Sequence, residues 1–432
     1  MGSDYEEPTR LVILQAIDSQ QTAEAEGDIA KPPDGGYGWV CLACCFASNC
    51  FTWGITSSYG VYLSYYLSEQ LFPQSTPLDY AFIGSLNFGV AMVVAPLVTR
   101  LARSFGIRPI MLAGAIMFGG GYISASFATR IWQLYLSQGA LVGLGVGFIY
   151  VPSIAVLSQW FTKRRSLANG ISAAGSGIGG LSFSFAIGAM IDHLGIGWAL
   201  RITGLCGLVA NLLSASFIRD RNQIIRPKQH PFDASLLRRA DVILLLLWAF
   251  FSTFGYIALL YSMSDFALSI GLSRQQATQV TAFLNMGTAL GRPFIGVASD
   301  RFGRFGVSTT LTLVCGIACF AIWIPASSFG VTVFFGILIG GILGVFWMTI
   351  APLCVEVVGL RQLPSLLSLS WLSVVLPTTF SEVIALYIRR SDSPRPYLYT
   401  QLFCGLCYIC ASCCLWAVRT LCKRREMTAG QR

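Results

Sequence analysis

Residues 32–39 read Pro-Pro-Asp-Gly-Gly-Tyr-Gly-Trp and stand directly before the first long apolar run of the chain. Trp and Tyr favour the boundary between membrane and water, because their rings are apolar while their N–H and O–H groups need polar partners. Glycine permits a bend or a close backbone contact where a helix begins. The stretch therefore indicates where the chain enters a membrane, and an ordinary interfacial anchor is the simplest alternative to a functional motif.

The composition of the whole chain also indicates a membrane protein. Of the 432 residues, 54% are hydrophobic and 11% are charged, whereas a soluble globular protein carries roughly 25% charged residues. The polar residues 1–36 lack the basic start, the short apolar core and the small-residue cleavage site of a signal peptide. We expect them to form a disordered cytosolic N-terminal tail.

Twelve apolar runs follow, with lengths close to the ~20 residues of a membrane-spanning helix. They lie near 38–66, 80–98, 109–128, 131–157, 167–190, 198–218, 242–268, 276–299, 306–326, 330–352, 365–388 and 397–418. The polar stretch 219–241 divides six runs from six and is predicted to be a cytosolic central loop. The sequence therefore predicts an all-α membrane protein with twelve transmembrane helices in two six-helix halves, 37–218 and 242–418, followed by a cytosolic C-terminal tail at 419–432.

The basic residues predict the orientation. Most Lys and Arg residues outside the runs fall on alternate loops and on both tails, and loops of this kind face the cytosol. Both termini are therefore expected in the cytosol, and the plasma membrane is the expected location because no internal targeting signal is evident. This distribution also accounts for the net charge of +9, so no nucleic-acid partner is predicted.

The motifs of common enzymes and metal sites do not support either class. The metalloprotease motif His-Glu-x-x-His, the nucleophile elbow and the Walker loop are absent, so neither an enzyme nor an ATP-driven pump is expected. Cys404, Cys407, Cys410 and Cys413 have the spacing of a metal-ligand series. The same spacing spreads thiols around a lipid-buried helix, where Cys behaves as a small hydrophobic residue. We favour this second interpretation, and no metal or cofactor is predicted.

Four segments carry a resemblance to a known family. Besides residues 32–39, they are the loop 160–170 between the fourth and fifth runs, the small-residue stretch 173–180, and the segment 358–365. In this order they resemble the signatures of the monocarboxylate porter family of the major facilitator superfamily, in the form of its fungal members. The residues that match in the first two motifs are Asp34, Gly35, Gly36, Trp39, Lys163, Arg164, Arg165, Asn169 and Gly170.

The resemblance implies the twelve-helix major facilitator fold and a secondary transporter that alternates between inward and outward access. Animal members move small monocarboxylates with a proton, and they use a Lys in helix 1 and an Asp and an Arg in helix 8. In this sequence the Lys position falls on Ser57 and the Asp position on Thr288, so that only Arg292 matches. This departure speaks against an inherited lactate–proton mechanism.

The function favoured by the resemblance is export of a small organic anion or a secondary metabolite, to which fungal relatives are often linked. Proton-coupled uptake of a monocarboxylate or a vitamin is the first alternative. A metabolite sensor that does not transport is the second, although such sensors usually carry long cytosolic extensions and the tails here have about 36 and 14 residues. The predicted partners are a small-molecule substrate and the lipid bilayer, with a proton as the candidate coupling ion; no accessory subunit is assigned.

Arg292 is the first candidate for a substrate or gating contact. A charged residue at bilayer depth costs at least ~2.5–3.5 kcal/mol, so it usually faces a cavity or a partner. Asn285, Thr288 and Arg292 recur on one helix face, and a guanidinium can hold a carboxylate by two parallel hydrogen bonds. Ser57 joins them as a predicted contact from the first run. The alternative is a structural Arg292, bonded to backbone carbonyls or to an acidic partner.

Two acidic residues are candidates for a proton carrier, because a desolvated carboxyl group holds a proton more readily. Glu382 lies in the eleventh run, and Asp265 lies near the outer end of the seventh. The alternative role of Glu382 is that of ion partner to Arg292, and the alternative for Asp265 is contact with water. Tyr150, Tyr256 and Tyr261 could form aromatic walls of a site for a larger ligand. Aromatic residues more often serve packing, and we favour that role for them.

The loop after the eighth run, 296–304, reads Gly-Val-Ala-Ser-Asp-Arg-Phe-Gly-Arg. It resembles the facilitator-superfamily motif Gly-x-x-x-Asp-Arg-x-Gly-Arg. Asp300, Arg301 and Arg304 are therefore predicted to latch one conformation through charge-assisted hydrogen bonds, and a plain basic loop that only sets the topology is the alternative. The corresponding loop after the second run, 100–108, has no Asp, and there we favour the plain loop.

Overall fold

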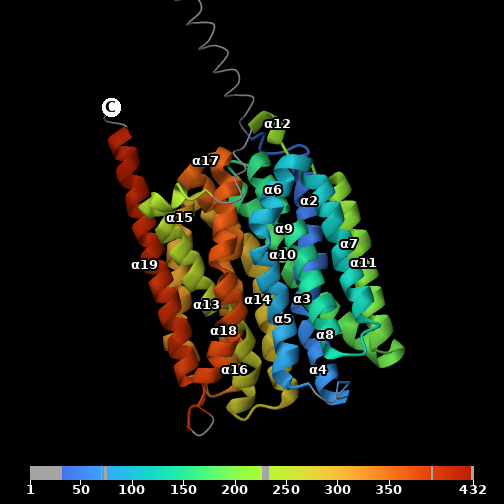
Figure 1. The fold of residues 1–432 in the computed structure, drawn as a ribbon. Helices are drawn as coiled ribbons and strands as arrows, with labels where there is room; N and C mark the ends of the chain where they lie inside the picture. Colours follow the sequence, from blue (N-terminus) through green and yellow to red (C-terminus); the bar gives the residue numbers. More distant parts are fainter. Residues whose placement is uncertain (1–31, 70, 73–74, 226–232, 391–392, 430–432) are drawn as a thin grey trace, which may run out of the picture.

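The computed structural model describes residues 32–69, 71–72, 75–225, 233–390 and 393–429. Every regular element within these ranges is a helix, and the long helices run side by side as a bundle (Figure 1). Helix α2 begins and helix α19 ends at the same end of this bundle (Figure 1). We call it the basic end; it carries the two loops predicted to face the cytosol at 161–165 and 300–304.

The N-terminal half is built from six helical rods. Some of the rods are divided into several elements by a bend or a π-helical stretch. In chain order the elements are α2 (Gly38–Asn49), η1 (Cys50–Gly54), α3 (Ile55–Ser57), α4 (Tyr59–Glu69), α5 (Pro77–Val93), α6 (Ala95–Phe105), α7 (Ile107–Ala125), α8 (Ile131–Leu134), η2 (Tyr135–Leu141), α9 (Val142–Trp160), α10 (Arg165–Leu194) and α11 (Ile196–Phe217).

The C-terminal half follows after two short helices, α12 (Asn222–Ile225) and η3 (Leu236–Arg238). Its elements are α13 (Ala240–Ser269), α14 (Arg274–Phe302), α15 (Arg304–Ala318), η4 (Cys319–Trp323), α16 (Phe329–Leu343), α17 (Val345–Ser373), α18 (Val375–Ile388) and α19 (Leu398–Ala429). The two halves meet where α10 packs along α14 and where α5 packs along α18.

The helices account for the twelve predicted crossings. Nine helical stretches in the described part of the chain are long and apolar enough to cross a membrane, and the pair α5 and α6, bent by 46°, makes a tenth. One of the nine, Phe329–Ala385, contains two crossings, because Gly359 breaks it with a φ of 75° that other residues rarely adopt. The remaining crossing is α14, whose polar residues place it outside this test of length and apolarity.

Small residues of α10 let it touch helices on two sides. A Cβ atom added at Gly179 would lie 2.3 Å from the carbonyl oxygen of Cys50, and one at Gly170 would lie 2.5 Å from the carbonyl oxygen of Arg292. Contacts as close as these require glycine, as in membrane helices that pack backbone against backbone. The stretch 173–180 thus lies between the first rod of the N-terminal half and α14 of the other half.

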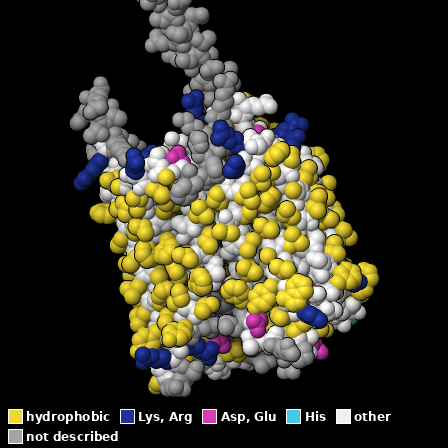
Figure 2. All heavy atoms as spheres, in the orientation of Figure 1, with side chains coloured by type: hydrophobic (Ala, Val, Ile, Leu, Met, Phe, Trp, Pro, Cys, Tyr) yellow, Lys and Arg dark blue, Asp and Glu magenta, His cyan; other side chains and the backbone are white. Residues whose placement is uncertain are grey.

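The surface of the bundle suits a lipid environment. Figure 2 shows hydrophobic side chains over the flank of the bundle, with Lys and Arg gathered toward its two ends. Large apolar side chains are more than half exposed on several helices, among them Phe185, Leu205, Phe294 and Trp416. Apolar surface on this scale marks contact with a membrane or a partner, and the length of the helices identifies the membrane.

Candidate functional site

Arg292 lies at the contact between the two halves. The side chain projects from α14 toward α10 and is only 4% exposed. Its Nη1 donates to the carbonyl oxygen of Ala173 at 2.5 Å and to the Oγ of Ser176 at 2.6 Å. Both acceptors belong to α10, so the guanidinium bridges the halves.

The positive charge of Arg292 has no acidic counterpart among the described side chains. Its Nε makes no hydrogen bond, and the ion pairs of the described residues all involve other arginines. The guanidinium hydrogen bonds to the hydroxyl oxygen of Tyr256, and the hydroxyl group of Tyr150 lies near it. The guanidinium also rests against Gly344, where a Cβ atom would lie 2.8 Å from it. A buried charge without a counterion is costly, so this site favours an anion.

Aromatic rings from both halves surround the same region. We define the central aromatic cluster as Trp53, Tyr150, Tyr256, Trp347 and Trp371. The ring of Trp53 lies 5.4 Å from that of Tyr150 and 6.1 Å from that of Trp347. Trp371 lies 5.4 Å from Tyr150 and stacks on Trp347 at 6.0 Å. Tyr256 closes the cluster at 5.9 Å from Trp347, and its two tyrosines are those that face Arg292.

The predicted site residues Ser57, Thr288 and Asn285 are placed differently. The hydroxyl group of Thr288 donates to the carbonyl oxygens of Leu284 and Gly340, at 3.1 and 3.0 Å, and so joins α14 to α16. Ser57 is exposed and donates to the carbonyl oxygen of its own helix at Gly54. Asn285 is half-buried on α14. The geometry therefore brings Arg292 together with the aromatic cluster, while the hydroxyl protons of Thr288 and Ser57 are engaged by backbone.

Neither predicted proton carrier is seen to contact Arg292: Asp265 has other partners, and the side chain of Glu382 is not among the described ones. Asp265 forms an ion pair with Arg389 and accepts a hydrogen bond from the hydroxyl group of Tyr397, and its side chain is 41% exposed. This agrees with the alternative of contact with water. Glu382 lies in α18, and its side chain is outside the described residues.

Asp300 and Arg304 connect the halves at the basic end. The carboxylate of Asp300 accepts hydrogen bonds from the backbone N–H groups of Ser166 and Leu167, at 3.0 and 2.8 Å, in the first turn of α10. An anion is favoured there because the first N–H groups of a helix have no partner inside the helix. Arg304 donates to the carbonyl oxygen of Thr162 at 2.6 Å and pairs with Asp300 at 3.3 Å.

The third residue of the predicted latch, Arg301, stands apart from this network. It is exposed, and its guanidinium lies 5.5 Å from the ring of Phe302. Arg304 instead gains a second acidic partner, since its Nη1 lies 3.2 Å from the Oε1 of Glu356. The sequence did not single out Glu356, whose contact with Arg304 arises only when α15 and α17 pack together.

The motif at residues 34–39 binds the same loop from within the N-terminal half. Asp34 accepts hydrogen bonds from the N–H groups of Thr162 and Lys163, at 2.7 and 2.8 Å, and its own N–H donates to the carbonyl oxygen of Trp160. Trp39 packs edge-on against Phe161 at 5.2 Å. The motif at residues 34–39 therefore holds in place the loop that carries the motif at residues 160–170.

The other residues of the loop motif have structural partners. Arg165 is buried and donates to the carbonyl oxygens of Phe161 and Ser158. The side chain of Asn169 donates to the carbonyl oxygen of Arg165 at 2.9 Å. Lys163 and Arg164 are exposed at the basic end, where basic residues suit a cytosolic loop.

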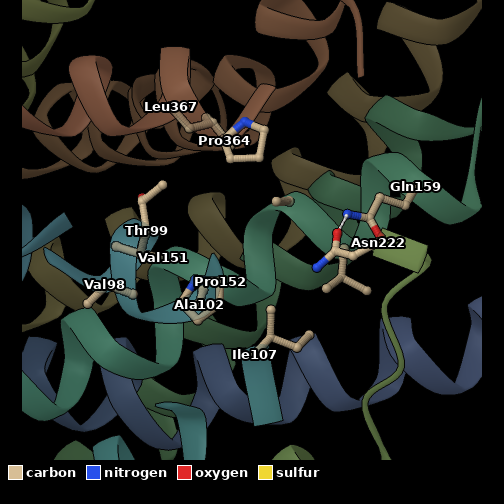
Figure 3. A pocket seen from close by; sticks show the side chains of 12 residues that line it. Val98, Thr99, Ala102, Ile107, Val151, Pro152, Gln159, Asn222, Pro364 and Leu367 are labelled. Carbon is tan, nitrogen blue, oxygen red and sulfur yellow. Dashed lines mark hydrogen bonds between the residues drawn. The ribbon is translucent and has the colours of Figure 1, made fainter. Parts of the chain in front are cut away.

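Two cavities in the described structure lie outside the Arg292 region. One, of about 40 Å³, is at the basic end between the halves; Figure 3 shows Gln159 hydrogen bonded to Asn222 on one side of it and Pro364 of α17 on the other. Ligand pockets have roughly 300–1,000 Å³, so this space admits only a few waters. The other, of about 750 Å³, is an open apolar groove between α2 and α11 without a charged lining residue, which does not suit an anion.

Comparisons with known proteins identify the family of the chain and its relatives. The profile of the Major Facilitator Superfamily matches residues 42–381. The chain is 35% identical over 393 residues to the "Probable transporter MCH2" of Saccharomyces cerevisiae, which covers 90% of this chain and 83% of that protein. It is 29% identical over 424 residues to the "Fujikurins efflux protein" of Gibberella fujikuroi, covering 97% of this chain and 90% of that protein.

A solved structure shows the same fold at low sequence identity. The proton:xylose symporter XylE, bound to 6-bromo-6-deoxy-D-glucose, superposes with a TM-score of 0.71 over 88% of this chain and 95% of that chain. The identity is 12%, so the likeness concerns the arrangement of helices and not the ligand.

Proposed function

The chain belongs to the Major Facilitator Superfamily, and from this membership we propose that it exports a small organic anion or a secondary metabolite by alternating access. Like its relatives, it is a membrane transporter and not an enzyme. The observation that carries the proposal is Arg292: a buried guanidinium at the contact between the halves, with a free Nε and without a described carboxylate beside it. An anionic substrate would supply the missing counter-charge.

The contacts around Arg292 support its exposure during a transport cycle. Its two hydrogen-bond acceptors belong to α10, while Arg292 itself belongs to α14. A movement that separates these helices therefore releases the guanidinium for a ligand. At the basic end the same movement must break the bonds of Asp300 and Arg304, which we assign as the conformational latch.

Orientation and subfamily are part of the proposal. We place the basic end and both termini in the cytosol, and the protein in the plasma membrane, because Lys and Arg concentrate on cytosolic loops. We further assign the chain to the monocarboxylate porters on its motifs at 34–39 and 160–170. Export is supported by one relative, the fujikurins efflux protein of Gibberella fujikuroi.

Proton-coupled uptake is the second candidate function. Glu382 in α18 is the acidic residue that we assign as a candidate carrier. The side chain of Asp265 is paired with Arg389, which makes Glu382 the better choice. A transport rate that stays independent of pH would exclude this function.

The experiment compares strains that lack the gene with strains that regain it. Untargeted mass spectrometry of cells and medium is expected to show at least one organic anion that falls in the medium and rises in the cells on deletion. Wild-type protein restores the export, whereas Arg292→Ala does not at equal surface expression. Arg301→Ala, which alters an exposed arginine outside the latch contacts, serves as the control. An unchanged medium after deletion contradicts export.

A further inference from the structure

Two buried indole groups in the central aromatic cluster have hydrogen atoms to donate and nothing to receive them. The Nε1 atoms of Trp53 and Trp371 make no hydrogen bond, although the side chains are only 8% and 0% exposed. The neighbouring Trp248 shows the usual arrangement, since its Nε1 donates to the Oγ1 of Thr312 at 3.4 Å. A buried donor without an acceptor costs about 1–3 kcal/mol.

The place of these two indoles distinguishes them from ordinary packing. Trp53 comes from the N-terminal half and Trp371 from the C-terminal half, and both contact Tyr150, which faces Arg292. Trp323 is also buried with an unpaired Nε1, but it packs within the C-terminal half against Phe266 and Phe335. Only the first two therefore lie where separation of the halves would admit a ligand beside the guanidinium.

The three unpaired groups and the rings define the chemistry of a ligand. The Nε of Arg292 needs an anion, and the Nε1 atoms of Trp53 and Trp371 need acceptors such as carbonyl oxygens. The rings of Trp347 and Trp371 lie nearly parallel, with 14° between their planes, and aromatic faces of this kind pair with other flat rings. A flat ligand with an acid at one end and oxygen atoms on its rings meets all three requirements.

We propose that the central aromatic cluster binds the ring system of an oxygenated aromatic carboxylic acid, whose carboxylate is held by Arg292 and whose ring oxygens accept from Trp53 and Trp371. This inference rests on the proposed function, because it names the substrate class of the same transport site. Trp53 and Trp371 are then specificity-determining residues, and small aliphatic acids are poor ligands.

The test is calorimetric binding to the full chain in lipid nanodiscs with three acids. Anthraquinone-2-carboxylate is flat and carries ring carbonyls, 2-naphthoate is flat without them, and decahydro-2-naphthoate is neither. We expect 2-naphthoate to bind about tenfold more tightly than its saturated analogue through ring contacts. Anthraquinone-2-carboxylate is expected to bind about fivefold more tightly again through its acceptors.

Conservative variants separate the indole N–H groups from the rings. Trp53→Phe and Trp371→Phe keep an aromatic ring and are expected to abolish the advantage of anthraquinone-2-carboxylate while leaving the advantage of 2-naphthoate over its saturated analogue. Trp323→Phe removes an equally unpaired indole away from the site and is expected to change nothing. Thermal unfolding of each variant verifies that it is folded.

The outcomes also separate this inference from the proposed function. Equal affinity for the flat and the saturated acid, an undiminished anthraquinone advantage in both Trp variants, or no binding of any of the three acids overturns the inference. Flux of aliphatic anions alone in proteoliposomes overturns it as well and leaves the proposed transport intact. Selective binding of the aromatic acids without flux in either direction supports the inference and contradicts transport.

Discussion

Asp34 and Asp300 bind neighbouring backbone amide groups at the loop before α10 and in the first turn of that helix. Asp34 accepts from the N–H groups at 162–163, and Asp300 accepts from those at 166–167. Asp34 belongs to the same half as this loop, whereas Asp300 comes from the other half. Of these two carboxylates, only Asp300 must lose its bonds to the loop when the halves separate at the basic end, so Asp34 can keep the loop in shape throughout.

Replacing Asp300 is expected to loosen the contact between the halves. Asp300→Asn removes the negative charge that the amides of Ser166 and Leu167 bind, and hydrogen bonds to a charged group contribute about 1.5–3 kcal/mol. Hydrogen–deuterium exchange in nanodiscs is therefore expected to rise roughly tenfold at 166–170, where opening becomes easier.

Asp34→Asn is the matched control, because it removes the same charge at the loop before α10. Exchange is expected to rise at 162–163 while 166–170 stays protected. If the two variants give the same exchange pattern, the separate assignments of the two carboxylates are wrong.

The close packing of α10 predicts that replacing two of its glycines by alanine will change the stability of the protein differently. Gly179→Ala would place a Cβ atom 2.3 Å from the carbonyl oxygen of Cys50, and overpacking of this kind costs about 1–3 kcal/mol. Gly188 is in the same helix, and a Cβ atom there meets nothing within 4 Å. Gly188→Ala is therefore expected to be neutral or to stabilise by up to ~1 kcal/mol.

Thermal unfolding in detergent compares these two variants with the wild type. The midpoint is expected to fall for Gly179→Ala and to stay or rise for Gly188→Ala. Equal losses in both variants would show that helix α10 does not depend on backbone contact with the first rod.

Asp79 predicts an acid-sensitive tie at the end opposite the basic end. Its carboxylate accepts from the N–H and hydroxyl groups of Thr76 and from the hydroxyl group of Tyr135, each at 2.8 Å. These bonds, the backbone one first, lower the pKa of Asp79 below its ordinary value. A lowered pKa in the folded state contributes stability above the ordinary pKa, and this contribution is lost as the pH falls through the folded value.

Melting curves between pH 7 and pH 3 test this tie. Asp79→Asn is expected to be less stable than the wild type at pH 7, and the difference is expected to shrink only below about pH 4. A difference that already vanishes near pH 6 would mean that another group governs the acid sensitivity.

The helices could be predicted from the sequence, but their interruptions could not. Apolar length alone marks the crossings, and the two-half arrangement follows from the polar stretch at 219–241. The π-helical stretches Cys50–Gly54 and Tyr135–Leu141 leave no mark in the apolar pattern of the sequence.

For the site, a single residue could be predicted from the sequence, but its contacts could not. Arg292 stands out because a single charged residue within an apolar run can be recognised from the sequence alone. Its acceptors Ala173 and Ser176 cannot, because they face it only after α10 and α14 pack together. The unpaired donors of Trp53 and Trp371 become evident only from the surrounding structure.

Flux through the purified protein tests the role of Arg292 most directly. Proteoliposomes with the wild type, Arg292→Ala or the control Arg301→Ala are loaded with organic anions extracted from culture medium, and the compounds that leave are quantified by mass spectrometry. Efflux of at least one anion is expected from liposomes with the wild type or Arg301→Ala. With Arg292→Ala, its efflux is expected to fall to the level of loaded liposomes without protein. Loss of the same anions at the same rate with Arg292→Ala would contradict the assignment of Arg292 as the substrate contact.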